Sequence, residues 1–209
     1  MIRLLGKIPR RIAIAVSGGA DSMAALDFLK RDRDVTVLHY NHGTEHADEA
    51  ERVVREYCEN HNIDLLAGKL REHPPSGRSR EDFWREKRYD FFENLGFIAN
   101  YRSVPVITCH HLDDAVETWI FSSLHGEGKI IPHQRDRYLR PFLLTRKATL
   151  EDWCDRHDVP YVIDPTNQDV LFMRNYIRHE LMPKALRVNP GIHKVLRKKI
   201  KMRFDSSED

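Results

Sequence analysis

Residues 11–22 read RIAIAVSGGADS, and this stretch decides the fold. Residues 11–17 form a short apolar run rich in Ile and Val, which is typical of a buried strand. Gly18 and Gly19 follow at once, and helical spacing begins at Asp21. A strand, a glycine loop and a helix in this order let backbone N–H groups and the positive helix end approach phosphate oxygens. A helix cap without a ligand is the plainer interpretation of the same residues.

The alternation of strand and helix continues toward the C-terminus. Strands are predicted at residues 35–40, 63–70 and 104–109, and helices at residues 21–30, 45–61, 80–101 and 113–124. Because strands that alternate with helices build a parallel sheet covered on both faces, we expect an α/β fold with a doubly wound parallel sheet. Beyond residue 126 we expect a helix at residues 147–157, a brief strand at 161–164, and helices near 173–187 and 191–203.

Composition narrows the class of protein. The 209 residues are 41% hydrophobic and 32% charged, enough to bury one good core. No run approaches the roughly 18 apolar residues of a membrane span, so we expect a soluble cytoplasmic protein. A net charge of +2 is too balanced to predict nucleic-acid binding, which would need a local patch such as residues 193–203 with Lys198 and Lys199. A solvated terminal helix explains that patch equally well.

A second polar cluster, HHLDDAVET at residues 110–118, follows the strand predicted at 104–109. Ligands bind beyond the carboxyl ends of parallel strands, so this position favours a functional site. On a helix Asp113, Asp114 and Glu117 point near one face. Carboxylates so placed can chelate a metal, bind a cationic amine, or interact only with the helix dipole.

The loop at residues 17–22 resembles the SGGxDS signature of PP-loop ATP pyrophosphatases, which cleave ATP between the α- and β-phosphates. HHLDDAVET narrows the resemblance to the tRNA(Ile)-lysidine synthetase family. Further stretches similar to that family follow in its order over residues 11–190: YNHG (40–43), EDFWREKRY (81–89), RPFL (140–143), DPTN (164–167) and RNYIR (174–178). The resemblance implies a Rossmann-like PP-loop catalytic domain over residues 1–144, a C-terminal helical part over 145–203 packed on it, and a disordered acidic tail at 204–209.

The resemblance also implies a two-step reaction. The C2 oxygen of the wobble cytidine in a CAU-anticodon isoleucine tRNA attacks the α-phosphate of ATP, and free lysine then displaces AMP. It implies Asp21, Asp114 and Glu117 in the lysine pocket, with His110 and one of Arg85 and Arg88 nearby. ATP and Mg²⁺ would be held by Ser17, Gly18, Gly19, Ala20, Asp21, Ser22 and His42, with Asp21 a candidate metal ligand. RNA phosphates would face Arg140, Arg174, Asn175, Arg178, Lys198 and Lys199.

The chain departs from this family in three places, one of which is Trp84, where the family commonly has alanine. The family's Arg-Gly-Ser-Gly stretch reads HGEG at residues 125–128, and its usual C-terminal domains do not follow residue 190. We therefore expect a truncated form that binds tRNA through its last helix or as a homodimer. A PP-loop enzyme with another substrate and an ATP-binding regulatory module are the alternatives. A tRNA thiolase is disfavoured because Cys58, Cys109 and Cys154 include no C-x-x-C pair.

Overall fold

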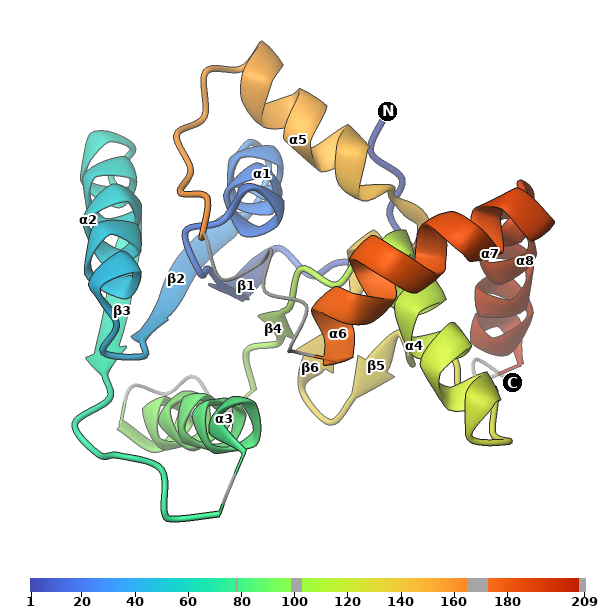
Figure 1. Cartoon of the computed structure of the whole chain (residues 1–209). Coiled ribbons are helices and arrows are strands. Elements are labelled where there is room, and N and C mark those ends of the chain that lie inside the picture. Colours follow the sequence, from blue (N-terminus) through green and yellow to red (C-terminus); the bar gives the residue numbers. More distant parts are fainter. Residues whose placement is uncertain (78, 99–102, 165–172, 207–209) are drawn as a thin grey trace.

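The computed structural model describes residues 1–77, 79–98, 103–164 and 173–206. Its strands form one six-stranded sheet in the order β3-β2-β1-β4-β6-β5 (Figure 1). The strands are β1 (Arg11–Ala15), β2 (Asp34–Asn41), β3 (Asp64–Lys69), β4 (Val106–Ile107), β5 (Gln134–Arg135) and β6 (Tyr138–Leu139). All neighbouring pairs are parallel except β5 with β6. The predicted α/β class and parallel sheet are confirmed, with one antiparallel edge strand added.

Helices follow the strands as the alternation predicts. They are α1 (Ala20–Leu29), α2 (Glu45–Asn60), α3 (Arg80–Ile98), α4 (Leu112–Leu124), the 3₁₀ turn η1 (Pro141–Leu144) and α5 (Lys147–Arg156). The chain ends with α6 (Met173–Tyr176), the π-helical turn η3 (Ile177–Leu181), α7 (Met182–Val188) and α8 (Ile192–Asp205). Among the described helices, none is both long and apolar enough to cross a membrane.

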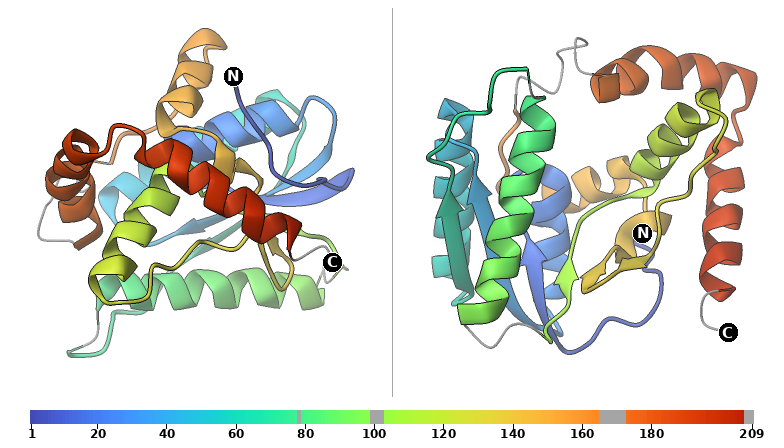
Figure 2. Two further views of the ribbon diagram at one scale, coloured as in Figure 1. Left: turned by 90° about the vertical axis from the view of Figure 1, so that its right-hand side faces the viewer. Right: turned by 90° about the horizontal axis from the view of Figure 1, so that it is seen from below.

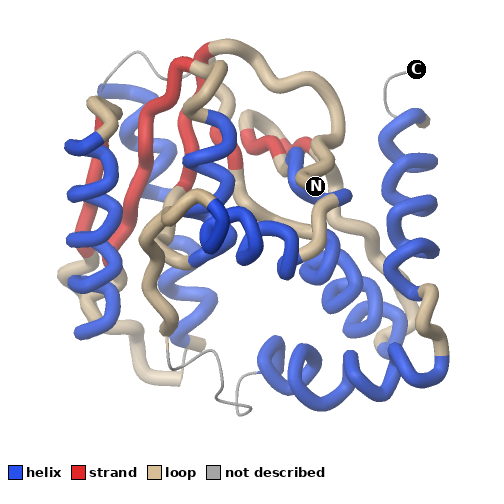
Figure 3. Tube along the Cα trace, turned by 90° about the horizontal axis from the view of Figure 1, so that it is seen from above, coloured by secondary structure: helices blue, strands red, loops and turns tan. Residues whose placement is uncertain are grey.

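The two faces of the sheet bury different side chains. Ile12 and Ile14 of β1 join one core together with residues of α1, α2 and α5. Ala13, between them, joins another core with Phe92 of α3. This alternation follows from the period of two along a strand. Figure 2 shows α3 on its own side of the sheet, and Figure 3 shows helices on both sides of the strand layer.

The C-terminal helices do not form one separate unit. Leu150 and Cys154 of α5 join the core beneath α1, whereas Ile192 and Leu196 of α8 pack with α4 in a third core. The division at residue 144 therefore stays a prediction. Helix α8 continues to Asp205, so residues 204 and 205 are helical and not part of a disordered tail. Residues 207–209 lie outside the described residues.

Two short elements differ from expectation. The strand predicted at 161–164 is wrong: this segment is extended, and Val162 donates one backbone hydrogen bond to Gly18 O (2.9 Å) without forming a ladder. The hairpin of β5 and β6 was not predicted, because strands of two residues are too short for an alternating pattern to appear. Residues 99–101 of a predicted helix and 165–167 of the DPTN stretch lie outside the described residues.

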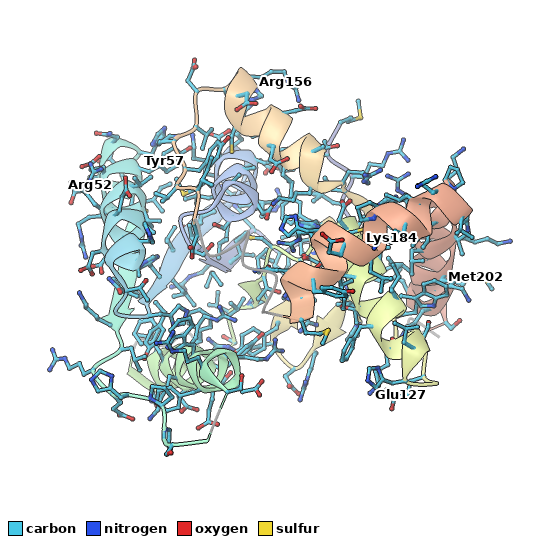
Figure 4. All side chains as sticks on the ribbon, viewed as in Figure 1. Arg52, Tyr57, Glu127, Arg156, Lys184 and Met202 are labelled. Carbon is cyan, nitrogen blue, oxygen red and sulfur yellow. The ribbon has the colours of Figure 1, made fainter. Side chains whose placement is uncertain are left out.

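Asp27 of α1 joins three helices. Its carboxylate is 5% exposed and accepts hydrogen bonds from Tyr57 Oη of α2 (2.7 Å) and Trp153 Nε1 of α5 (2.8 Å). Figure 4 shows Tyr57 between α2 and α1. Asp27→Ala leaves two donors without their acceptor and is expected to lower the free energy of unfolding by about 3 kcal/mol. Urea denaturation measures the loss.

Asp32→Ala is the matched control, because the Asp32 side chain is 67% exposed. It should change the stability by less than about 0.5 kcal/mol. Burial favours the neutral acid, but hydrogen bonds from Tyr57, Trp153 and Lys30 lower the pKa of Asp27 to about 2. A carboxyl with a lowered pKa stabilises the fold above its ordinary value of 3.8, and this stabilisation is lost as the pH falls toward 2. Equal losses in both variants would contradict the role assigned to Asp27.

Candidate functional site: a cavity at the strand switch point

The strand order reverses between β1 and β4, and a cavity of about 460 Å³ opens at the carboxyl ends of these strands. Ligands of open α/β sheets bind at such a reversal, since the loops diverge there. The lining comes from the ends of β1, β2 and β4, from the first turns of α1 and α4, from α2 and α3, from Val162 and Asp164, and from one residue of α6. The volume lies in the usual range of about 300–1,000 Å³ for ligand pockets.

The loop after β1 is held by its own hydroxyls. Ser22 Oγ donates to Gly19 O (2.9 Å), accepts from Ser17 N (3.1 Å) and lies 3.2 Å from Ser17 Oγ. The loop ends at the N-terminus of α1, where the first N–H groups have no partner within the helix. The two hydroxyls and this helix end thus face the cavity together. An anionic ligand would find several donors there.

Gly18 gives the loop its shape. Its φ is +90°, and a Cβ built on it would lie 2.9 Å from Ala50 Cβ and 3.1 Å from Ala50 O of α2. Gly18→Ala is therefore expected to lower the free energy of unfolding by about 2 kcal/mol, through an unfavourable φ and a close contact with helix backbone. Thermal or urea unfolding without nucleotide measures this.

Gly19→Ala is the matched control for that substitution. Gly19 has a φ of −78°, and the nearest atom to a built Cβ is Ser17 Oγ at 3.7 Å. The change should cost less than about 1 kcal/mol, the usual loss when alanine replaces a favoured N-cap residue. Equal destabilisation by both substitutions would show that the loop does not depend on the left-handed conformation at Gly18.

Asp21 lines the cavity and lies beside the buried ring of His111. Asp21, in the first turn of α1, has its Oδ1 buried without a hydrogen-bond partner among the described residues, and its Oδ2 lies 3.5 Å from His111 Nε2. His111 caps α4: its Nδ1 accepts from Asp114 N (3.2 Å), and its backbone N–H donates to Asp114 Oδ2 (2.9 Å). Because Nδ1 accepts, the proton of a neutral ring lies on Nε2 and faces Asp21.

The carboxylates of Asp114 and Glu117 are paired with two arginines. Arg174 Nη2 lies 2.6 Å from Asp114 Oδ1, and Arg174 Nε lies 3.2 Å from Glu117 Oε2. Arg178 donates to Glu117 through Nε (2.7 Å) and Nη2 (3.1 Å). Burial favours the neutral acid, but His111, Arg174 and His110 lower the pKa of Asp114 to about 2. Asp114 is therefore ionised near neutral pH.

His110 and His42 are neutral members of the cavity wall. Burial lowers the pKa of each imidazole to about 4. His110 Nδ1 lies 3.1 Å from Thr108 Oγ1, whereas His42 Nδ1 is buried without a hydrogen-bond partner among the described residues. The His42 ring stacks on Trp84 of α3, with ring centroids 5.3 Å apart. This wall offers an aromatic surface and a polar atom able to meet a ligand.

Most predicted ATP-binding and catalytic residues come together. The cavity is lined by Ser17, Gly19, Asp21, Ser22, His42, His110, Asp114 and Arg88. Gly18 and Ala20 belong to the same loop, and Glu117 lies one helical turn behind Asp114. Arg85 is exposed and does not line the cavity, so Arg88 is the member of that pair that reaches it.

The predicted RNA-binding residues are placed differently. Arg174 and Arg178 hold carboxylates, and Arg140 is 6% exposed with its Nη1 donating to Pro132 O (3.0 Å). Asn175 is buried as well, so neither it nor Arg140 presents its side chain to RNA without rearrangement. Lys198 and Lys199 are exposed on α8, whose residue Met202 lies at the edge of the molecule remote from α2 (Figure 4).

The sequence did not single out His39, which belongs to this region. His39 of β2 is buried, its Nδ1 lies 2.9 Å from Val16 O, and its Nε2 has no hydrogen-bond partner among the described residues. Trp84 of α3 also lines the cavity. The prediction that Asp113 points near the same face as Asp114 is wrong: Asp113 turns away from the cavity and accepts from Lys147 N, Arg146 Nε and His193 Nε2. The position of His39 beside the YNHG stretch was the available signal.

A nucleotide with its metal fits these residues better than a metal alone. Within the described ranges, no group of three or more His, Cys, Asp or Glu side chains is placed to hold an ion. Asp21 Oδ1 is nevertheless a buried carboxylate oxygen with no hydrogen-bond partner in the part of the chain that the structure describes, and it lies beside a loop suited to phosphates. Since Mg²⁺ usually binds through one or two carboxylates plus substrate phosphates, Asp21 and the loop suit a metal that arrives with ATP.

Comparison with known proteins agrees with this geometry. A family model described as a PP-loop domain matches residues 3–185. The chain belongs to the PP-loop domain family. Membership accounts for the glycine loop after β1 and for the reversal of strand order beside it, and it implies that the PP-loop binds ATP.

Several curated relatives of this PP-loop chain are named tRNA(Ile)-lysidine synthase. The chain is 31% identical to the Francisella philomiragia protein, covering 98% of this chain and 53% of the relative. It is 30% identical to the Thermotoga maritima protein, with coverage of 87% and 46%. It is 34% identical to a Staphylococcus epidermidis protein, with coverage of 90% and 47%. The chain thus spans about half the length of these relatives.

Solved structures share the fold. The U34-tRNA thiolase NcsA from Methanococcus maripaludis superposes with a TM-score of 0.75 at 13% identity, covering 95% of this chain and 73% of that chain. The NH3-dependent NAD synthetase from Campylobacter jejuni gives 0.51 at 11% identity, with coverage of 94% and 86%. At such low identity these similarities concern the PP-loop fold alone.

Proposed function

We propose that this chain is the catalytic PP-loop part of a tRNA(Ile)-lysidine synthetase. It would adenylate C2 of the wobble cytidine of a CAU-anticodon isoleucine tRNA with ATP and Mg²⁺, and then attach lysine with release of AMP. One observation carries the proposal: the phosphate-type loop and Asp114 line one cavity, and Glu117 lies one helical turn behind Asp114. The names of the relatives supply the substrates. Such a tRNA-modifying enzyme would be cytoplasmic, and a homodimer stays a prediction.

In the first step, the loop at residues 17–22 would hold the phosphates that leave as pyrophosphate. Ser17 and Ser22 now hydrogen-bond to each other, and their hydroxyls would turn to the phosphate oxygens. Asp21 and the phosphates would hold Mg²⁺, which would supply charge neutralisation for the leaving group. His42 and Trp84 would bound the space for a base.

In the second step, Asp114 and Glu117 would orient the lysine amine. Ionised Asp114 attracts an ammonium group, and neutral His110 beside it can accept the proton that the attacking amine must lose. Arg88 lines the same cavity and suits the phosphate of AMP or of the tRNA backbone. Asp114, His110 and Arg88 line the cavity, and Glu117 lies one helical turn behind Asp114.

A PP-loop enzyme that adenylates another substrate is the second candidate. The observation in its favour is that Asp114 and Glu117 are already paired with arginines, so a lysine amine meets no open acid pair. A thiolase finds less support. Burial raises the pKa of the Cys58 thiol to about 11 and that of Cys154 to about 12, which keeps both thiols protonated and unreactive.

Pyrophosphate release from ATP tests the proposal, measured with and without unmodified CAU-anticodon isoleucine tRNA and lysine. Nucleoside mass analysis of the tRNA completes the experiment. We expect release that requires the tRNA, and a cytidine heavier by one lysine less water. Release without that nucleoside would favour the second candidate. Absence of release under every condition would point instead to an ATP-binding regulatory module.

A further inference from the structure

Two arginines pair with the carboxylates that would bind the lysine amine in the proposed function. The inference drawn from this pairing rests on that proposed function. Asp114 is 6% exposed and Glu117 is 3% exposed. Two carboxylates so deeply buried need counter-charges, because an unpaired buried charge is strongly destabilising. Arg174 and Arg178 supply them. The cluster is therefore neutral before any substrate arrives.

The two arginines are not equivalent. Arg178 makes two parallel hydrogen bonds to Glu117, and its side chain is 22% exposed. Arg174 makes one hydrogen bond to each carboxylate, lines the cavity, and has a side chain that is 49% exposed. A bidentate pair is the stronger of the two arrangements. Arg174 is thus the arginine that can leave, and its departure frees one hydrogen-bonding position on Glu117 Oε2 and leaves Asp114 Oδ1 with the longer ion pair to Arg178 Nη2 at 3.6 Å.

Lysine cannot simply add to this cluster. An ammonium group beside two carboxylates and two guanidinium groups would leave an excess positive charge in a buried site, where like charges repel strongly. Binding of the amine therefore requires Arg174 to move away. A guanidinium leaves a buried carboxylate most readily for another anion that offers the same bidentate geometry, and a phosphate does so.

We propose that Arg174 couples RNA binding to lysine binding. A phosphate of the RNA draws Arg174 from Asp114 and Glu117, and the freed oxygens accept the lysine amine. Arg88, which lines the same cavity, adds a second positive charge facing that phosphate. Arg174 is a positioning residue in this scheme. Without RNA it keeps free amines out of the site, and this gives an order of binding in which RNA precedes lysine.

Calorimetric titration of lysine tests the coupling in the wild-type chain without nucleotide, so that no reaction occurs. The titration is made with and without a saturating anticodon stem-loop RNA that carries CAU. We expect the RNA to tighten lysine binding roughly tenfold, within the usual range of coupling between sites. Lysine must then tighten RNA binding by the same factor, because linkage is reciprocal. Equal lysine affinity with and without RNA would overturn the inference.

Arg174→Gln should bind lysine without RNA about as tightly as the wild type binds it with RNA, and RNA should add nothing further. Arg187→Gln, on the exposed side of α7, is the matched control and should keep the full effect of RNA. An Arg174→Gln chain that still needs RNA would contradict the gating role. The wild-type titrations decide the matter even where this variant folds poorly.

The inference and the proposed function fail in different ways. If the chain forms lysidine but binds lysine equally tightly with and without RNA, the proposed coupling is wrong and the proposed function stands. Absence of lysine binding under both conditions, together with absence of lysidine, removes both. If RNA tightens lysine binding but no lysidine forms, the role of Arg174 stands and the bound amine must take part in another reaction.

Discussion

Replacing Asp21 with alanine is expected to reduce pyrophosphate release from ATP roughly a hundredfold or more, the usual effect of removing one group that stabilises transition-state charge. Asp21 stands in the first turn of α1, directly after the phosphate-type loop, and lines the cavity. Its Oδ1 is buried without a hydrogen-bond partner among the described residues. Burying a carboxylate oxygen without a hydrogen-bond partner costs free energy of folding unless a ligand or a metal ion binds that oxygen. Steady-state pyrophosphate release with saturating tRNA measures the loss.

The free energy of unfolding of the Asp21 variants distinguishes a role in pyrophosphate release from a structural role. Because Asp21 Oδ1 has no described partner, Asp21→Ala should leave the free energy of unfolding within about 1 kcal/mol of the wild type, as for a group kept for function. Asp21→Asn keeps the shape and removes the charge, so it should lose activity nearly as fully as alanine. An asparagine variant with normal turnover would show that the charge is not needed. A large loss of stability would make Asp21 structural instead.

Much of the site could be predicted because it depends on local sequence. A strand that ends in Gly18 and Gly19, and polar residues that follow later strands, identify the loops at the carboxyl edge of a parallel sheet without knowledge of packing. Asp21, His42, His110 and Asp114 therefore meet as expected. The strand order, which reverses beside these loops, brings together residues that are about ninety positions apart in the chain.

The remainder depends on tertiary contacts that no local pattern records. Arg174 lies 60 positions after Asp114, and only the packing of α6 and η3 on α4 brings their charges together. Asp113 and Asp114 are neighbours, yet a helix turns about 100° per residue, so one holds α5 and α8 while the other faces the cavity. Arg140 looks like a surface charge in sequence, but its side chain is buried and donates to the backbone carbonyl of Pro132.

Glu117→Gln is expected to raise the lysine concentration needed for half-maximal transfer roughly tenfold or more, because a neutral amide loses a charge-assisted bond to an ammonium. ATP binding should change little, since Glu117 does not line the cavity beside the loop at residues 17–22. Glutamine keeps an acceptor for Arg178. Titration of lysine into the lysidine-forming reaction, with ATP affinity measured separately, checks both expectations.

Glu117→Ala should impair lysine transfer more than ATP binding as well, but with a further effect on the fold. It removes both hydrogen bonds of the half-buried Arg178 to Glu117 and leaves Arg178 with its 3.6 Å ion pair to Asp114, so the loss should stay below the roughly 3–5 kcal/mol of a fully buried broken pair. Asp113→Asn is the matched control, because Asp113 belongs to the same acidic run but holds Lys147 N and His193. It should lower stability without changing the lysine dependence. If lysine dependence is unchanged in the glutamine variant, Glu117 serves only to neutralise the arginines, and the amine must be oriented by Asp114 alone.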